Sequence, residues 1–599
     1  MKKCSFALLL LVVSLINFAT ARSDPVVRLS HGGELRGLSL TFLDKPVDLF
    51  QGVRYAQPPT GDLRFRKPVP TSWEGVVDAK ESGNVCPHLN FPDHVRVVGD
   101  EDCLFLHVTV PGRVKKGLKK AVMFWIHGGG YAVGSGQSYV GAPLAVFGDV
   151  IVVTINYRLG PLGFLYDGPG TGNFGLWDQR AAMIWVQENI AQFGGDPDRV
   201  TIFGESAGGG SISAHTQSPH SEGLFQRAIQ ESGTLFLPWS WDLVTSPKKE
   251  MENTLRRNHC PDGKSPSIYE CLRNVPLSTL LATAEVKQFL NSAFKPTADG
   301  DFFPEDINVN NYLSSQRFDL MSGVNGQEGL LVYAFELLFS NASLFTEGIS
   351  KQAVNEYVLT KCRKEIAPLS PQLCLQYITA AYELNSTNDD FGRTSRLIEF
   401  LGDHFFGIDI TFNLEEHSES SKSTYAYYFT ELVERKGTNS MWPHPSWNSQ
   451  VAADHADEIL FVFGAPFLKD DKSEFWTDLR DADSNTAKVL ISLSEDEDKA
   501  LSKVIMQLWS NFAKSGNPNE PTTLAEGIPV WPEFNKETNL FLELNSNDIK
   551  TVTTPNKERK QKLRQTLYAD RELQRKHLQA SQDDQLKSKQ NTAVHHEEL

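Results

Sequence analysis

The segment FGGDPDRVTIFGESAGGGS, residues 193–211, places a serine among glycines directly after a β-branched run. Arg199–Phe203 has the composition of a short strand, and Ser211–Thr216 can continue a helix after the glycines. A strand, a tight turn and a helix together form a nucleophile elbow, and Gly204 and Gly208 avoid the side-chain clashes of such a turn. The segment therefore predicts that its central serine is a nucleophile rather than a loop residue.

That serine, Ser206, cannot attack an ester without help. It needs a base within hydrogen-bond reach, an acid that orients the base, and N–H donors for the oxyanion that forms. The run HGGGY, residues 127–131, follows an apolar stretch and offers bare backbone donors. In folds that carry the elbow, the acid and then the histidine follow the serine in the chain. His455 is the preferred base because small residues and carboxylates flank it in VAADHADE, with His404 and His417 as competitors.

The elements that must position these residues alternate in type. Apolar runs at 104–110, 121–126 and 150–156 predict strands, and the last two are apolar enough to be covered on both faces. Leu176–Phe193 has apolar residues at helical spacing, and a short strand follows it. This alternation predicts an α/β fold with a mostly parallel, doubly wound sheet. Residues 240–420 are more helical and irregular, which predicts insertions over the carboxyl ends of the strands.

The charge balance limits the classes of partner. The chain has 599 residues, and 58 Lys+Arg against 74 Asp+Glu give a net charge of −16. An acidic surface repels phosphate backbones, so we expect no nucleic-acid partner.

The two ends of the chain predict processing and targeting. Residues 1–21 have two lysines, a short apolar run and Ala-Thr-Ala, which is the pattern of a cleaved secretory signal. The sequence has no later stretch of about 20 apolar residues, so we expect no transmembrane segment. Residues 22–555 are then expected to form one domain, and 556–599 a charged tail that begins as a helix. The tail ends in His-Glu-Glu-Leu, similar to the KDEL class of endoplasmic-reticulum retrieval signals, so a retrieval receptor is a possible partner.

Six cysteines remain after removal of the signal, an even number that points to disulfides in a secretory chain. Their order suggests three local loops, although six cysteines allow 15 connectivities. The suggested pairs are Cys86 with Cys103, Cys260 with Cys271, and Cys362 with Cys374. Asn341 and Asn385 stand in N-x-S/T acceptor sequences for glycosylation.

Several long segments, in order, resemble the type-B carboxylesterase family of carboxylesterases and cholinesterases, from about residue 25 to 550. The serine segment matches that family's signature throughout. EDCLFLHVTVP, residues 101–111, resembles its second signature, except that His107 stands where Asn, Asp or Ser is usual. Other similar segments are QGVRYAQPPTGDLRF, NYRLGPLGF, GLWDQRAAMIWVQENI and GVNGQEG. The resemblance implies an α/β-hydrolase fold with helical insertions over the active site.

The resemblance also implies roles for particular residues. Ser206 matches the nucleophile, Glu328 the acid and His455 the base. The backbone N–H groups of Gly129, Gly130 and Ala207 match the oxyanion hole of that family. Two residue pairs resemble the family's buried structural ion pairs: Arg64 with Glu101, and Arg158 with Asp178.

The implied reaction is two-step acyl transfer from small-molecule carboxylic esters, with no metal or cofactor required. If His455 is the base, the rate should fall below about pH 6 as the ring gains a proton. The segment between Cys86 and Cys103 has no tryptophan to hold a quaternary ammonium, which disfavours choline esters. The alternatives are a neutral-lipid lipase, a cholinesterase-like esterase, or a neuroligin-like binding protein without catalysis.

Overall fold

The computed structural model describes residues 24–90, 96–241, 245–260, 267–283, 294–303, 317–338, 341, 343–364, 370–433, 453–471 and 496–568. The predicted signal sequence and the C-terminal tetrapeptide lie outside the described residues. Within them, none of the helices is both long and apolar enough to cross a membrane.

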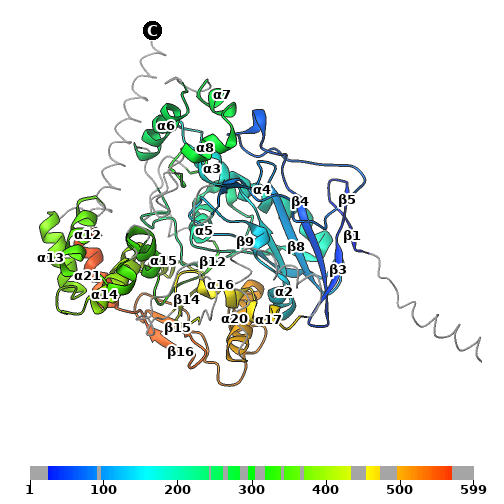
Figure 1. Cartoon of the computed structure of the whole chain (residues 1–599). Helices are drawn as coiled ribbons and strands as arrows, with labels where there is room; N and C mark the ends of the chain where they lie inside the picture. Colours follow the sequence, from blue (N-terminus) through cyan, green and yellow to red (C-terminus); the bar gives the residue numbers. More distant parts are fainter. Residues whose placement is uncertain are drawn as a thin grey trace, which may run out of the picture.

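An 11-stranded sheet forms the centre of the molecule (Figure 1). Neighbouring strands are parallel in the run β10, β9, β11, β12, β13, β14 and β15. Antiparallel strands complete both edges of the sheet. This arrangement confirms the predicted α/β class and mostly parallel sheet. In spatial order the strands are β16 (Lys550–Thr553), β15 (Leu540–Leu544), β14 (Thr424–Phe429), β13 (Asp319–Asn325), β12 (Arg227–Glu231), β11 (Gly195–Glu205), β9 (Lys120–Ile126), β10 (Ile151–Ile155), β8 (Phe105–Pro111), β4 (Lys45–Arg54) and β3 (Leu38–Phe42).

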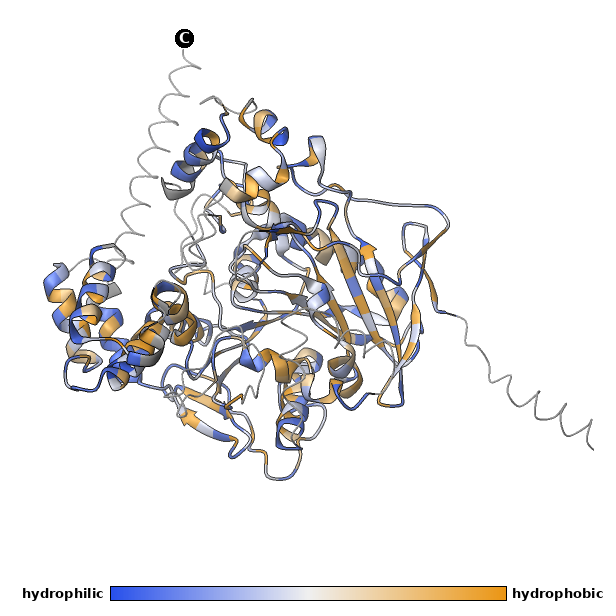
Figure 2. Ribbon diagram, viewed as in Figure 1, coloured by the Kyte–Doolittle hydropathy of each residue, from blue (hydrophilic) through white to orange (hydrophobic). Residues whose placement is uncertain are grey.

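Helices cover both faces of this sheet because its strands are apolar on both sides. Along β9, Val122, Phe124 and Ile126 pack into one core cluster, which also contains residues of α4 (Phe174–Asn189) and α5 (Ala207–Gln217). Met123 and Trp125 pack into the other. The second cluster is covered by helices α2 (Ala142–Gly148), α16 (Asp457–Val462), α17 (Ala465–Leu468) and α20 (Asp496–Ser515). Figure 2 shows hydrophobic residues concentrated along the central strands.

Two small sheets and a series of inserted helices complete the fold. The small sheets comprise β1 (Val26–Arg28), β2 (Glu34–Arg36) and β5 (Val76–Asp78), and β6 (His88–Leu89) with β7 (Val97–Val98). The other helices are α3 (Gly160–Phe164), α6 (Thr245–Arg257), α7 (Ser267–Arg273), α8 (Leu277–Thr283), α10 (Gly329–Tyr333), α11 (Leu344–Glu347), α12 (Lys351–Lys364), α13 (Pro371–Ala381), α14 (Asp390–Gly402), α15 (Ile408–His417) and α21 (Lys557–Leu563). Five-residue π-helical segments occupy 334–338, 403–407 and 564–568.

The predicted strands and helices are present with small changes at their ends. The helix predicted from Leu176 begins at Phe174 and finishes as a 3₁₀ turn at Ile190–Phe193. The larger difference is at α5, which begins at Ala207 and includes the glycines that were predicted to precede it. A Cβ at Gly208 would lie 2.0 Å from the carbonyl oxygen of Ile126. The glycines therefore let the first turn of α5 pack directly against the end of β9.

The covalent and ionic links predicted from the sequence are also present. All three local disulfides form, Cys86–Cys103, Cys260–Cys271 and Cys362–Cys374. Arg64 Nε donates to Glu101 Oε1 at 2.6 Å. Arg158 Nε and Nη2 each donate to the buried carboxylate of Asp178 at 2.7 Å.

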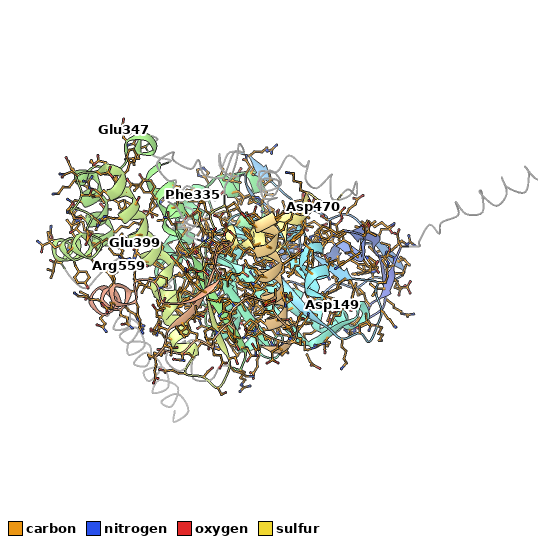
Figure 3. The ribbon with its side chains drawn as sticks, turned by 90° about the horizontal axis from the view of Figure 1, so that it is seen from below. Asp149, Phe335, Glu347, Glu399, Asp470 and Arg559 are labelled. Carbon is orange, nitrogen blue, oxygen red and sulfur yellow. A yellow bond between two sulfur atoms is a disulfide. The ribbon has the colours of Figure 1, made fainter. Side chains whose placement is uncertain are left out.

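The charged segment after Pro555 begins as a helix, as expected, and this helix, α21, docks against α14 (Figure 1). Arg559 pairs with Glu399 of α14, and Figure 3 shows these two residues side by side. Arg559 and Lys560 also lie 3.2 and 3.3 Å from the carboxylate of Asp403.

Candidate active site

Ser206 lies at the turn between β11 and α5, with φ 56° and ψ −122°. Positive φ is strained for a residue with a side chain and persists only where the surroundings hold it. The Ser206 N–H donates to the carbonyl of Glu231 at 2.8 Å, and its carbonyl accepts from Gly210. A Cβ at Gly204 would lie 2.3 Å from the Ile126 carbonyl, so glycine is needed on this side of the turn as well. These contacts form the predicted nucleophile elbow.

Glu328 and His455 meet although 127 residues separate them in the chain. Glu328 follows β13, and His455 precedes α16. A hydrogen bond from Gln327 N to Ala453 O, 2.8 Å long, ties the two loops together. His455 Nδ1 then lies 2.6 Å from Glu328 Oε2. Both side chains are buried, so the ring and the carboxylate are held in one orientation.

The other oxygen of the Glu328 carboxylate is fully engaged. Glu328 Oε1 accepts from the hydroxyl of Ser232 at 2.5 Å and from the backbone N–H of Asn325 at 2.7 Å. These bonds fix the position of the carboxylate, which suits a group that orients an imidazole.

The second ring nitrogen of His455 faces the elbow. His455 Nε2 lies 2.9 Å from Oε1 of Glu205, the residue before Ser206, and this contact is not aligned as a hydrogen bond. The ring also packs on Phe406, with centroids 4.8 Å apart. Within the described residues, the structure forms no hydrogen bond between the Ser206 hydroxyl and His455. Glu328 and His455 are thus joined beside the turn that carries Ser206, and the described contacts include no bond from the ring to the Ser206 hydroxyl.

The surroundings of His455 change its titration. Burial lowers the pKa of the imidazole, but the charges of Glu205 and Glu328 raise it by more, so the pKa lies well above the ordinary value of 6.5. As the pH is lowered, the rate should therefore begin to fall while the pH is still above 6.5. This is higher than the limit near pH 6 that an isolated imidazole suggests.

The predicted oxyanion donors lie beside the elbow. A Cβ at Gly128 would come within 3.1 Å of Ser206 Cβ, so the glycine loop passes directly over the nucleophile. Gly129 and Gly130 have φ of 106° and 61°, conformations that glycine adopts without strain. Their N–H groups have no acceptor in the part of the chain that the structure describes. Ala207 is the first residue of α5, so its N–H has no acceptor within that helix.

The competing histidines have structural environments instead. His417 Nδ1 lies 2.7 Å from the Thr424 hydroxyl, and burial lowers the pKa of His417 to about 4. The ring of His404 stacks on Phe400 at 5.6 Å. The unusual His107 is buried on β8, and burial lowers its pKa to about 4. His107 is therefore neutral and fills its place in the second signature as an uncharged side chain.

Sequence reasoning missed further polar groups of the site. Glu205, Glu231 and Glu458 are all buried around His455 and Glu328. A signal was present for the first two, because each is an ionisable residue at the end of an apolar strand. No comparable signal marks Ser232 as a partner of Glu328, because only the parallel pairing of β12 and β13 brings the following segments together.

Comparison with known proteins agrees with this geometry. The model of the carboxylesterase family matches residues 23–564. A bile salt-activated lipase from Homo sapiens is 33% identical over 540 residues, covering 86% of this chain and 66% of that protein, just under two thirds of its length. An acylcarnitine hydrolase from Mus musculus is 33% identical over 547 residues, covering 88% and 89%. Liver carboxylesterase 1 from Oryctolagus cuniculus is 33% identical over 550 residues, covering 86% and 88%. With its α/β sheet, its nucleophile elbow and a family match over nearly the whole described chain, this protein belongs to the carboxylesterase family.

Proposed function

We propose that the protein hydrolyses carboxylic esters through an acyl-enzyme, with Ser206 as nucleophile, His455 as base and Glu328 as the orienting acid. His455 takes the Ser206 proton as the hydroxyl attacks the ester carbonyl and then gives it to the leaving alcohol. Water repeats the two steps on the acyl-enzyme. The N–H groups of Gly129, Gly130 and Ala207 stabilise the oxyanion, and loss of one such donor typically costs about 2.7–4 kcal/mol of barrier.

The observation that carries this proposal is the 2.6 Å bond between His455 and Glu328 beside the elbow. A buried carboxylate on one ring nitrogen directs the other nitrogen towards the elbow, where a nucleophile must be deprotonated. The proton transfer requires the ring to turn from Glu205 to the hydroxyl of the adjacent residue, Ser206. Catalytic hydrogen bonds commonly tighten when substrate binds.

A labelling experiment tests the nucleophile. An organophosphonate probe should label the folded protein once and abolish hydrolysis of a short-acyl aryl ester. Ser206→Ala should prevent both. Ser213→Ala is the matched control, because Ser213 is a buried serine of α5, the helix that follows Ser206, and its hydroxyl contacts Thr234 at 3.1 Å. An unlabelled, folded wild type that leaves the ester intact would favour a binding protein instead.

The preferred substrates are esters of small or medium acyl chains. The similarity to a bile salt-activated lipase supports a neutral-lipid lipase as the second candidate. A panel of short-acyl, long-acyl, triacylglycerol, acylcarnitine and choline esters separates these possibilities by kcat/KM. Higher values for long-chain glycerides than for short esters would favour the lipase.

We also propose that the protein enters the secretory route, is glycosylated and is retrieved to the endoplasmic reticulum. Three disulfides fit an oxidising compartment. Asn341 is exposed, whereas the amide of Asn385 is half-buried and donates to Asn355, so Asn341 is the better glycan acceptor. Removal of the last four residues should send the protein to the medium, and Asn341→Gln should remove a glycan mass. Retention without the tetrapeptide would contradict the retrieval proposal.

A further inference from the structure

Two glutamates end neighbouring strands at the active site. Glu205 is the last residue of β11 and Glu231 the last residue of β12, and they are partners in the parallel register. Residues paired in register leave the same face of a sheet, and neighbouring strands lie about 4.8 Å apart. Both side chains are buried, Glu205 at 4% and Glu231 at 0% exposure. Two buried carboxyl groups thus lie on the same face of the sheet, at the ends of β11 and β12.

The hydrogen bonds of this pair are incomplete. Glu231 Oε1 accepts from the indole N–H of Trp509 at 2.7 Å. Glu231 Oε2 and Glu205 Oε1 have no hydrogen-bond partner among the described residues. Two ionised carboxylates can only accept hydrogen bonds, so neither can satisfy the other. A proton on Glu231 would remove the charge from a buried carboxyl group whose Oε2 has no donor among the described residues.

The charges around the pair also oppose double ionisation. Like charges in a buried pair force one carboxyl group to keep its proton. Among the described groups of the site, the imidazole of His455 can carry a positive charge, and it faces several carboxylates. The titratable groups that act on the pair from the surrounding elements are Glu328 after β13, Tyr427 on β14, His455 and Glu458 before and within α16, and Tyr139 after the 3₁₀ turn Gly136–Ser138.

The two glutamates differ in their neighbours. Burial raises the pKa of Glu205 as well, but the charge of His455, whose Nε2 lies 2.9 Å away, opposes this increase. Glu231 contacts a neutral indole instead. Burial raises the pKa of Glu231 to about 8, the bond from Trp509 opposes this, and the charge of Glu205 adds to it. Of the two, Glu231 is the one that stays protonated at neutral pH.

We propose that Glu231 is a positioning residue that holds a buried proton at neutral pH, so that Glu205 is the only charged member of the pair beside His455. This proposal deepens the proposed hydrolase function and rests on it. When Glu231 ionises, the second negative charge strengthens the hold of the site on the imidazolium proton. It also opposes the negative charge that develops on the ester oxygen at the adjoining elbow. Both effects slow the reaction.

The pH profile of a neutral variant tests the proposal. Glu231→Gln keeps the shape of the side chain and an acceptor for Trp509 but cannot ionise. The kcat/KM of each protein on a short-acyl ester is expressed relative to its own value at pH 7, so that the shape of the profile is compared. At pH 9 the wild type should fall behind by up to about tenfold, because one pH unit above a pKa leaves about a tenth of the groups protonated. Superimposable profiles from pH 7 to 9.5 would overturn the proposal.

A matched control separates this effect from the loss of any buried glutamate. Glu415 on α15 is also buried, and burial raises its pKa, but it lies 3.6 Å from Arg564 and outside the glutamate cluster. Glu415→Gln should keep the wild-type shape of the profile. If it removed the alkaline decline as Glu231→Gln does, the proposal would fail.

Infrared spectroscopy tests the buried proton without relying on activity. The folded wild type at pH 7 should show the carbonyl band of a protonated carboxylic acid that disappears near pH 8. Glu231→Gln should lack that component, and Ser206→Ala should retain it. A wild type that shows the band but hydrolyses no ester would refute the proposed function alone. An active wild type whose spectrum is unchanged by Glu231→Gln would refute the buried proton alone.

Discussion

At the scale of single residues, the site depends on how carboxylates share one imidazole. Glu328 is held by two donors and bonds to Nδ1 of His455, while Glu205 faces Nε2. The first contact fixes the tautomer that a general base needs. The second explains why the ring stays near the elbow before substrate arrives. His455 is thus positioned from both sides, by the last residue of β11 and by a residue of the loop after β13.

Replacement of Glu328 by glutamine should separate charge from shape. The amide cannot stabilise the imidazolium, and the comparable change in a serine protease triad lowers kcat by about 10⁴-fold. Glu328→Gln should therefore lower kcat/KM by about 10³–10⁴-fold, measured on a short-acyl ester. A loss below tenfold, with the fold intact by circular dichroism, would contradict the assigned acid.

The acid side of the wild-type profile follows from the same contacts. Only the neutral ring can act as base, and its pKa is raised, so activity is present above that pKa and is lost as the pH falls through it. The midpoint in kcat/KM should lie above 6.5, and a flat profile down to pH 4 would exclude the imidazole as base. In Glu328→Gln the residual activity should have a lower midpoint, because one of the two charges that raise the pKa is gone.

At the scale of elements, close packing of backbone places the nucleophile. The ends of β9 and β11 and the start of α5 approach one another so closely that side chains are excluded at Gly204 and Gly208. The same approach brings the glycine loop over Ser206. The spacing between Ser206 and the proposed oxyanion donors is therefore set by contacts between main chains.

Gly208→Ala should disturb this spacing. The added methyl group would meet the Ile126 carbonyl at 2.0 Å, so α5 must shift. A displacement of about 1 Å at a reacting group can cost about 10²-fold in rate, and we expect kcat to fall by that order. Gly392→Ala is the control, because in helix α14 the added atom meets only the tip of Asp389 at 3.0 Å. Equal activities of the two variants would argue against the packing explanation.

At the scale of the whole molecule, the helix near the carboxyl end of the described chain is tied into the fold. Helix α21 stands against α14 and places Arg559 and Lys560 on the buried carboxylate of Asp403. Asp403 begins the π-helical segment 403–407, which carries Phe406 to the ring of His455. The last described helix thus supports the packing around the active site from a distance.

Two truncations test this support. Removal of 569–599 leaves all of these contacts and should leave Tm and kcat/KM unchanged. Removal of 556–599 leaves Asp403 without its cations, and breaking a buried ion pair typically costs about 3–5 kcal/mol. The longer truncation should therefore lower Tm by several degrees, measured by calorimetry. Identical melting of both proteins would show that α21 contributes little.

Buried neutral histidines should make the whole fold sensitive to acid. Burial lowers the pKa of His107, His127 and His417 to about 4. The unfolded chain takes up these protons near pH 6.5 and the folded chain only near pH 4, so the free energy of unfolding decreases as the pH falls between these values. The shift at His107 corresponds to up to about 3 kcal/mol. His107→Asn should reduce the loss of stability between pH 6.5 and 4 in urea titrations, and an unchanged pH dependence would contradict this.

The sequence by itself indicated the fold class, the alternation of central strands and helices and the turn at Ser206, and it suggested the three local disulfides without excluding other pairings. These features depend on local composition, on glycine placement and on short sequence separations. It could not select His455 from three histidines without the family resemblance, and it gave no role to Glu205, Ser232 or Glu231. Their roles depend on parallel strand pairing between distant segments, which places buried carboxyl groups side by side. Only the tertiary structure decides those distances, and with them the charge of the site.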